Sequence, residues 1–268
     1  MPAPNQTVVF MDRLIINCDH LRSESESEEM ALADRLIINC DLGENESAEQ
    51  TRALLAWVNA ANIGCGLHAG SLENTRWAIQ QAQQSAVLIG AHPGLNTEGG
   101  RGQALPTTTG FRQLLSEQMG AFREAANALG AKVAYIKLHG SLYHAVEWDA
   151  GLAKTYLSFL RETRQGMAVF SLAGGSFAQR CEAAGIKVFR EAFADRAYRA
   201  DGSLVPRTEA GAVLPPDVAI KRLRHWWATG MMRTQNGESF PLAAQTLCVH
   251  GDSPGAVQLL QQIRGVIE

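Results

Sequence analysis

The chain has 268 residues, 46% of them hydrophobic, and a formal net charge of -3. This length is enough for one large core, and a single α/β barrel of roughly 200–250 residues is a common outcome. The mild acidity argues against nucleic-acid binding, which needs a basic stripe. We expect no membrane contact, because no apolar run approaches the ~20 residues of a span and the N-terminus lacks a signal-peptide pattern. The five cysteines include no CxxC pair, which argues against a thiolate zinc site and favours the reduced cytoplasm.

The eight-residue segment DRLIINCD occurs twice, at residues 12–19 and 34–41. The second copy continues into LGE and a helical pattern, whereas the first is followed by an acidic, low-complexity tract, RSESESEE. Such tracts are solvated and poorly ordered. We therefore predict an N-terminal extension over residues 1–33, which carries a partial duplicate of the first strand, and a barrel domain over residues 34–268. The alternative is that the first copy adds an edge strand or fills a gap in the barrel.

Short apolar, β-branched runs alternate with segments of helical periodicity from residue 34 onward. The runs predict seven strands, at residues 35–40, 59–66, 86–91, 133–138, 167–173, 187–193 and 246–251. The other segments predict seven helices, near residues 46–58, 71–85, 107–129, 144–164, 175–184, 216–229 and 254–267. Thr107–Thr109 can cap the third helix, and Pro215 and Pro216 suit the start of the sixth.

Strands that alternate with helices predict a parallel sheet with right-handed crossovers, either a closed barrel or an open doubly wound sheet. Polar side chains distinguish the two, because they follow the C-terminal ends of most strands. These residues are Asn39, Asp41, Glu44, His68, His92, Lys137, His139, Glu191, Asp195, Arg196, His250 and Asp252. Polar residues distributed around one rim are typical of a β/α barrel, whereas in an open sheet the functional residues cluster at one switch point of the strand order. We therefore predict an α/β fold, a seven-stranded β/α barrel with the functional site at its mouth.

Six segments occur in the order and spacing of the LamB/YcsF family: INCDLGE, ANIGCGLHAG, IGAHPG, IKLHGSLY, EAFADRAYRADGSLVPR and CVHGD. The chain resembles this family over about residues 36–268. The resemblance implies a seven-stranded barrel related to glycoside hydrolases and polysaccharide deacetylases. It also implies a hydrolase that opens 5-oxo-L-proline to L-glutamate, coupled to ATP hydrolysis, in a cytoplasmic complex with two other 5-oxoprolinase subunits.

The chain departs from the family's usual motifs at several positions. Leu67 and Ser71 stand where the family has Phe and Asp, and the loop at residues 94–102 lacks the family's Asp and GFGR turn. This loop follows a strand at the expected mouth, so another lactam or amide is an alternative substrate. Two alternative functions are a metal-dependent amidase or deacetylase of the same barrel superfamily and a substrate-binding subunit without catalytic activity.

Opening a lactam requires a base for water, stabilisation of the oxyanion and a proton for the leaving nitrogen. Asp41 and Glu44 are close in sequence at the first rim position, so mutual repulsion could raise the pKa of one of them and make it the base. Alternatively, Glu44 faces solvent or begins a helix at its favourable end. His68 and His139 are the candidate acid and base at neutral pH.

Substrate binding is expected from charged residues around the same rim. Lys137 lies within an apolar strand, where it could hold a carboxylate or phosphate, or could be neutralised by Asp41 or Glu191. Arg196 and Arg207 could clamp the substrate carboxylate, although Arg207 could instead form a salt bridge within its loop. Three residues at the ends of the last two strands complete the expected substrate-binding set: Glu191, Asp195 and His250.

A divalent metal ion is a second interpretation of the mouth. Asp41, His68 and His92 follow three consecutive strands, and one carboxylate with two imidazoles suits a hydrolytic ion. Kinship of the fold with deacetylases supports this site only by analogy. The sequence contains no closely spaced pair such as HxxxH, so the metal stays an alternative to acid–base catalysis.

The nucleotide has no obvious binding motif, because the chain lacks GxxxxGK[ST]. Gly174, Gly175 and Ser176 lie between a strand and a helix, where backbone amides could cradle a phosphate of ATP. The alternative is an ordinary turn with Ser176 as the helix cap. In that case, ATP is expected to bind a partner subunit.

Overall fold

The computed structural model describes residues 36–44, 46–67, 69–96, 104–163, 166–253 and 255–267. The chain divides into two units, residues 1–34 and 35–268. The predicted extension and the alternative that the first DRLIINCD copy adds a strand both lie outside the described residues. The fold below is that of the second unit.

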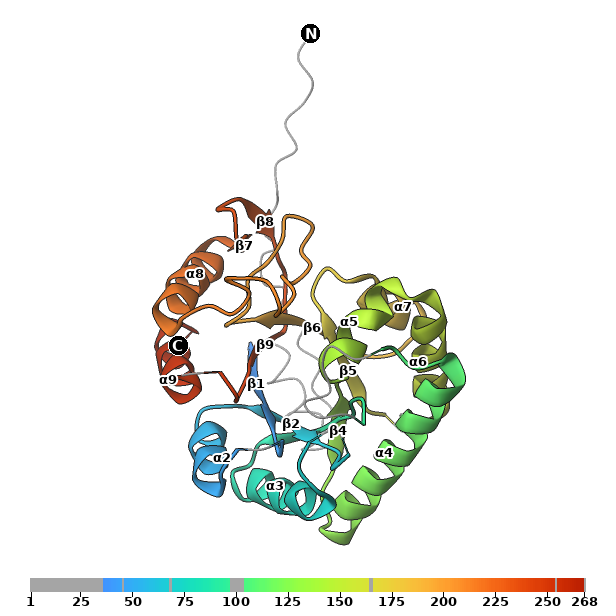
Figure 1. The fold of residues 1–268 in the computed structure, drawn as a ribbon. Coiled ribbons are helices and arrows are strands. Elements are labelled where there is room, and N and C mark those ends of the chain that lie inside the picture. Colours follow the sequence, from blue (N-terminus) through green and yellow to red (C-terminus); the bar gives the residue numbers. More distant parts are fainter. Residues whose placement is uncertain are drawn as a thin grey trace, which may run out of the picture. The chain divides into compact units, whose positions relative to one another are not determined.

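Seven parallel strands close into a barrel, in the order β1-β2-β3-β4-β5-β6-β9 (Figure 1). Their bounds are β1 Ile37–Leu42, β2 Ala60–Gly64, β3 Leu88–His92, β4 Val133–Ile136, β5 Ala168–Leu172, β6 Val188–Phe193 and β9 Thr246–Val249. The barrel is closed because β9 pairs in parallel with both β1 and β6. This arrangement confirms the predicted seven-stranded β/α barrel and excludes the open doubly wound sheet.

Helices surround the strands (Figure 1). Their bounds are α2 Ala48–Leu55, α3 Leu72–Gln84, α4 Thr108–Ala128, α5 Gly140–Trp148, α6 Ala150–Thr163, α7 Ser176–Ala183, α8 Pro216–Thr229 and α9 Ala256–Ile267. Ser47, Ser71 and Thr107 each cap a helix by accepting a hydrogen bond from the amide three residues later. Among the described helices, none combines the length and apolarity that crossing a bilayer requires.

Two local features differ from the sequence prediction. The single helix predicted at 144–164 is two helices, α5 and α6, separated at Asp149, whose backbone is extended. The Asp149 carboxylate accepts a hydrogen bond from the Leu152 amide at 2.9 Å and so caps the start of α6. The apolar periodicity of the sequence continues through this break, which is why one helix was predicted. A short antiparallel pair, β7 Met231–Arg233 and β8 Ser239–Pro241, was not predicted, because three-residue strands carry little periodic signal.

The interior of the barrel contains a chain of hydrogen-bonded polar side chains. The Asn39 amide donates to Glu191 Oε1 at 2.9 Å and to Thr246 Oγ1 at 2.7 Å. The Asn62 amide donates to Asn39 Oδ1 at 2.6 Å, and the Tyr135 hydroxyl donates to Asn62 Oδ1 at 2.7 Å. All five side chains are buried, and their mutual bonds offset the cost of removing them from water. The network thus links strands on opposite sides of the barrel below the mouth.

Gly90 makes room for this network. A methyl group added at Gly90 would lie 2.1 Å from Cε2 of Tyr135. The Tyr135 ring stacks on Phe170, with centroids 3.8 Å apart and planes 5° from parallel, so it cannot move aside easily. A residue without a side chain on β3 therefore positions the tyrosine hydroxyl against Asn62.

Gly90→Ala is expected to lower the free energy of unfolding by about 2–3 kcal/mol, because the methyl group would overlap the Tyr135 ring. Gly120→Ala on α4 is the matched control: nothing lies within 4 Å of its added methyl group. That control is expected to raise the free energy of unfolding by about 0.5–1 kcal/mol. Urea denaturation measures both, and a Gly90→Ala protein as stable as the parent would contradict the packing described here.

Candidate active site

Lys137 lies at the centre of the site, just beyond the end of β4. Its ammonium Nζ is 3.0 Å from Asp41 Oδ1, 3.1 Å from Glu191 Oε1 and 3.1 Å from the sulfur of Cys248. Burial alone lowers the pKa of the Lys137 ammonium, but the neighbouring carboxylates raise it well above its usual range. Lys137 is therefore a buried cation neutralised by Asp41 and Glu191, the second of the two roles considered from the sequence. Glu191 is itself fully buried against Lys137 and Asn39.

Asp41 is an ionised carboxylate. Its Oδ1 accepts hydrogen bonds from the Lys137 ammonium at 3.0 Å and from the Asn62 amide at 2.7 Å. Burial raises the pKa of the Asp41 carboxyl, but Lys137 and His92 outweigh burial and hold the pKa well below its usual range. The expectation that repulsion from Glu44 raises the pKa is thus wrong for Asp41, because the lysine is closer than any like charge. Asp41 therefore supplies a fixed negative charge and is not a general base with a raised pKa.

His92, His139 and Glu44 form a continuous polar chain beside Asp41. His92 Nδ1 is 2.8 Å from the Lys137 carbonyl oxygen, which can only accept, so this nitrogen carries the hydrogen. Burial lowers the pKa of His92 to about 4, and the neutral ring presents the lone pair of Nε2. That nitrogen lies 3.0 Å from His139 Nδ1, which is 2.8 Å from Glu44 Oε1. His139 Nδ1 is therefore within hydrogen-bond distance of both an imidazole nitrogen and a carboxylate oxygen.

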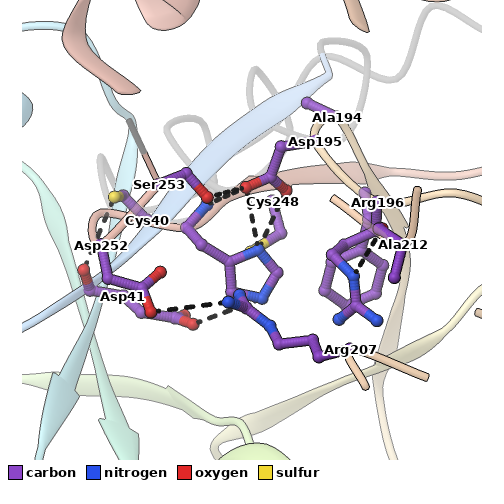
Figure 2. Close-up of polar contacts among 12 residues, drawn as sticks. Cys40, Asp41, Ala194, Asp195, Arg196, Arg207, Ala212, Cys248, Asp252 and Ser253 are labelled. Atoms are coloured by element: carbon purple, nitrogen blue, oxygen red, sulfur yellow. Dashed lines mark hydrogen bonds and ion pairs between the residues drawn. The ribbon is translucent and has the colours of Figure 1, made fainter. Parts of the chain in front are cut away.

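A second imidazole–carboxylate pair stands on the other side of Asp41. His250 Nδ1 lies 2.9 Å from Asp195 Oδ1. The Ser253 hydroxyl donates to Asp195 Oδ2 at 2.6 Å, and Figure 2 shows this contact. Burial raises the pKa of Asp195, but His250 and Ser253 hold it well below its usual range. The other nitrogen of His250, Nε2, is 4.0 Å from Asp41 Oδ2. Asp195 therefore orients the imidazole and does not face the cavity as a substrate ligand.

The two candidate substrate-binding arginines differ in their surroundings. Arg196 donates from Nε to the Ala212 carbonyl at 3.2 Å and from Nη2 to the Val205 carbonyl at 2.5 Å, so it shapes the loop after β6. Arg207 Nη1 is 3.6 Å from Asp252 Oδ2 (Figure 2). Its Nη2 is buried and has no hydrogen-bond partner among the described residues. Arg207 thus forms the predicted loop salt bridge and still presents a donor for an anion.

The same loop is anchored from outside by a third arginine. Arg222, on α8, is buried and donates from Nη2 to the carbonyls of Phe193 at 2.9 Å and Ala194 at 2.7 Å. Its Nη1 donates to the Arg196 carbonyl at 2.5 Å. Both Arg196 and Arg222 therefore bind main-chain oxygens, which fixes the path of the loop that forms one wall of the mouth.

A cavity of about 780 Å³ opens at this mouth. Its polar lining includes Asp41, His92, Lys137, His139, Arg207 and His250. This volume is within the range of small-molecule sites. Acid–base groups and a guanidinium around one cavity suit a small anionic substrate with a polar reacting bond.

The turn at Gly174, Gly175 and Ser176 is occupied by a carboxylate of the chain itself. The Phe177 amide donates to Glu147 Oε2 at 3.0 Å, and the Ser176 hydroxyl donates to the Glu147 carbonyl at 2.9 Å. A methyl group on Gly175 would lie 2.6 Å from Glu147 Oε1. Glu147 therefore takes the place expected for a phosphate at the start of α7, and the turn offers no support for a nucleotide site.

The expected metal ligands are brought together only in part. His68 lies outside the described residues. Asp41 and His92 do converge, with Glu44 and His139 completing a group whose possible ligand atoms all lie within 4.8 Å of one another. Sequence reasoning assigned Glu44 and His139 to acid–base catalysis alone. It also missed Cys248 beside Lys137, although alternation along the last strand places Cys248 on the same face as His250.

A family model described as the LamB/YcsF family matches residues 36–268 of the chain. The crystal structure of a lactam utilization protein from Thermus thermophilus is similar with a TM-score of 0.78 and 28% identity, over 87% of this chain and 95% of that one.

Other solved structures are similar at lower TM-scores and identities. An uncharacterized protein from Agrobacterium tumefaciens has a TM-score of 0.49 at 10% identity, over 86% of this chain and 82% of that one. A structure of the pneumococcal virulence factor StrH has a TM-score of 0.48 at 8% identity, over 89% of this chain and 84% of that one. Neither similarity carries an argument about function.

Lys137→Met is expected to lower the free energy of unfolding by about 3–5 kcal/mol, because it leaves Asp41 and Glu191 buried without a counter-ion. The control is Arg112→Met, which removes one partner of a solvent-exposed pair with Glu162 and is expected to cost less than about 1 kcal/mol. Chemical denaturation at neutral pH compares the two. Similar small losses in both variants would show that the buried ion pairs do not stabilise the barrel.

Proposed function

The chain belongs to the LamB/YcsF family, and we propose that it acts as the A-type subunit of a 5-oxoprolinase that hydrolyses 5-oxo-L-proline to L-glutamate. The similar structure from Thermus thermophilus is that of a lactam utilization protein, which supports a lactam as the substrate class. The observation that carries the proposal is the convergence of two imidazole–carboxylate pairs and an arginine on one cavity.

The two imidazole–carboxylate pairs match the two proton transfers of lactam hydrolysis. The Glu44–His139 pair, with His92, activates the attacking water, whose oxygen bonds to the lactam carbonyl carbon. The C–N bond then breaks, and His250, held by Asp195, donates a proton to the leaving nitrogen. The net change places a hydroxyl on the carbon and a hydrogen on the nitrogen. Asp41 stands between the pairs as a fixed negative charge that stabilises either imidazole when it is protonated.

Arg207 is the group that selects an anionic substrate. 5-Oxoproline carries one carboxylate outside its lactam ring, and a guanidinium nitrogen that is buried without a partner among the described residues fits that group. The acid–base residues and Arg207 line the same cavity, so one small molecule can meet both. Specificity for a lactam acid over a neutral lactam would follow from this contact.

ATP and two partner subunits complete the proposed reaction. An amide carbonyl is a poor electrophile, and transfer of the γ-phosphoryl group of ATP to the lactam oxygen, with release of ADP, would activate it. Attack by the first water and cleavage of the C–N bond then leave an acyl phosphate, which a second water hydrolyses to the carboxylate of glutamate and free phosphate. We assign nucleotide binding to the partner subunits, because Glu147 occupies the turn at Gly174–Ser176 and the chain has no P-loop motif. In this arrangement the chain holds the lactam while the nucleotide is supplied from another subunit.

Glutamate release is expected only when the purified chain is combined with 5-oxoproline, ATP and the two partner subunits. Release by the chain alone without ATP would overturn the proposal in favour of an ATP-independent amidase. No release from the full mixture would overturn 5-oxoproline as the substrate, and a rate in that mixture that Asp41→Asn leaves unchanged would favour a substrate-binding role. Asp41→Asn is expected to reduce the rate by about 100-fold or more, because the charge between the two imidazoles is lost. Asp217→Asn, at the exposed start of α8, is the control and should leave the rate unchanged.

Arg207→Gln is expected to raise KM for 5-oxoproline by about 10–100-fold with little change in kcat, since a charged hydrogen bond contributes about 1.5–3 kcal/mol. Arg190→Gln removes a guanidinium that pairs with Glu182 on the surface and should leave KM unaltered. The neutral lactam 2-pyrrolidinone should bind the parent and the Arg207→Gln protein equally weakly. A KM that Arg207→Gln does not change would place the substrate carboxylate elsewhere.

A further inference from the structure

We propose that Glu44, His92 and His139 bind one divalent transition-metal ion of the Zn²⁺ type, with Asp41 beside it. The three residues come from the loop after β1, the end of β3 and the loop after β4, so the closed barrel alone brings them together. This inference rests on the proposed function and replaces one of its steps: the three residues hold the ion, and water on the ion takes over from direct proton transfer to the Glu44–His139 pair. The ion site itself is measurable without the lactam reaction.

The distances among the three ligand atoms fit one small cation. His139 Nδ1 lies 2.8 Å from Glu44 Oε1 and 3.0 Å from His92 Nε2, and His92 Nε2 lies 3.7 Å from Glu44 Oε1. Ligands about 2.1 Å from a tetrahedral zinc ion are about 3.4 Å from one another. The three distances lie on both sides of that value, so an ion fits between the atoms after shifts of a few tenths of an ångström.

The chemistry of these atoms also favours a cation. The hydrogen on His92 Nδ1 is directed to the Lys137 carbonyl at 2.8 Å, which leaves a lone pair on Nε2 of the neutral ring. Metal-binding histidines characteristically donate their second nitrogen to such a carbonyl. His92 Nε2 faces two carboxylate oxygens, at 3.5 Å in Asp41 and 3.7 Å in Glu44. Binding of an ion by His139 Nδ1 requires the tautomer that carries its hydrogen on Nε2.

The donor set indicates which ions suit the site. Two imidazoles and one carboxylate form a ligand set that zinc uses in catalytic sites, where water fills the fourth position. Magnesium and calcium prefer oxygen ligands and are disfavoured. When bound, a zinc ion lowers the pKa of its water towards neutrality and so supplies a nucleophile. His92 and His139 line the cavity, so a water on the ion would meet the substrate.

A second group of possible ligands, Asp41, Cys248 and His250, is less suited to an ion. The Lys137 ammonium already contacts two of its members, Cys248 Sγ at 3.1 Å and Asp41 Oδ1 at 3.0 Å. A second cation there would be repelled at close range. The same contact makes Asp41 the weakest member of the first group, which is why Glu44 and the two histidines form the core of the site.

The full-length chain, freed of metal by dialysis against a chelator, is titrated with ZnCl₂ in a calorimeter without substrate or partner subunits. One ion per chain is expected. Glu44→Gln and His139→Gln are each expected to weaken binding by about 100-fold, since each removes one of three ligands. His144→Gln is the matched control, because His144 lines the same cavity outside the ligand group. Circular dichroism checks that each variant is folded.

Substitution by Co²⁺ gives a second readout. The parent chain should develop the visible absorption of a four-coordinate cobalt ion, and Glu44→Gln should lose it while His144→Gln keeps it. No saturable Zn²⁺ binding, or binding that Glu44→Gln and His139→Gln leave unchanged, would overturn the proposal. Binding lost in His250→Gln but kept in His139→Gln would overturn it in favour of the second group. These experiments measure ion binding and not turnover, so they can be interpreted even if the chain does not hydrolyse 5-oxoproline.

Discussion

Three strands that are not hydrogen-bonded to one another meet through one buried charge, the ammonium of Lys137. Asp41 lies in β1, Glu191 lies in β6 and Lys137 directly follows β4, and the two ion pairs span the interior at 3.0 and 3.1 Å. A buried cation is tolerated only with its counter-ions in place. Asp41 therefore stays ionised only when closure of the barrel brings Lys137 beside it. The site cannot form before β1, β4 and β6 have come together.

Lys137 acts on the mouth through its backbone as well as its side chain. The ammonium keeps Asp41 ionised, while the carbonyl of the same residue fixes the hydrogen of His92 on Nδ1. His139, two residues further along, lies on the same face and meets His92. One short segment after β4 thus sets the charge of one neighbour and the tautomer of another. On the other side of Asp41, Asp195 does the orienting work for His250.

The sequence was sufficient to predict the barrel, because apolar strand runs, helical periodicity and polar strand ends all carry local signals. Convergence of Asp41, His92 and His139 followed from that topology. The partner of Lys137 remained open, since two carboxylates at the rim were equally plausible until the barrel was closed. Glu147 at the start of α7 could not be predicted, because its contact joins segments about thirty residues apart through an angle between helices. The break at Asp149 was hidden for a different reason: the apolar pattern continues through it.

The loop after β6 is held by two arginines that donate hydrogen bonds to backbone oxygens. Arg196 and Arg222 contact the carbonyls of Val205, Ala212, Phe193 and Ala194. Substitutions along this wall of the cavity would therefore leave the path of the chain intact. The acid–base residues therefore lie at the ends of the strands, whereas the side chains of the loop after β6 can change without altering the backbone that carries them. After gene duplication, substitutions in this loop can change the substrate specificity of one copy while its catalytic residues stay the same.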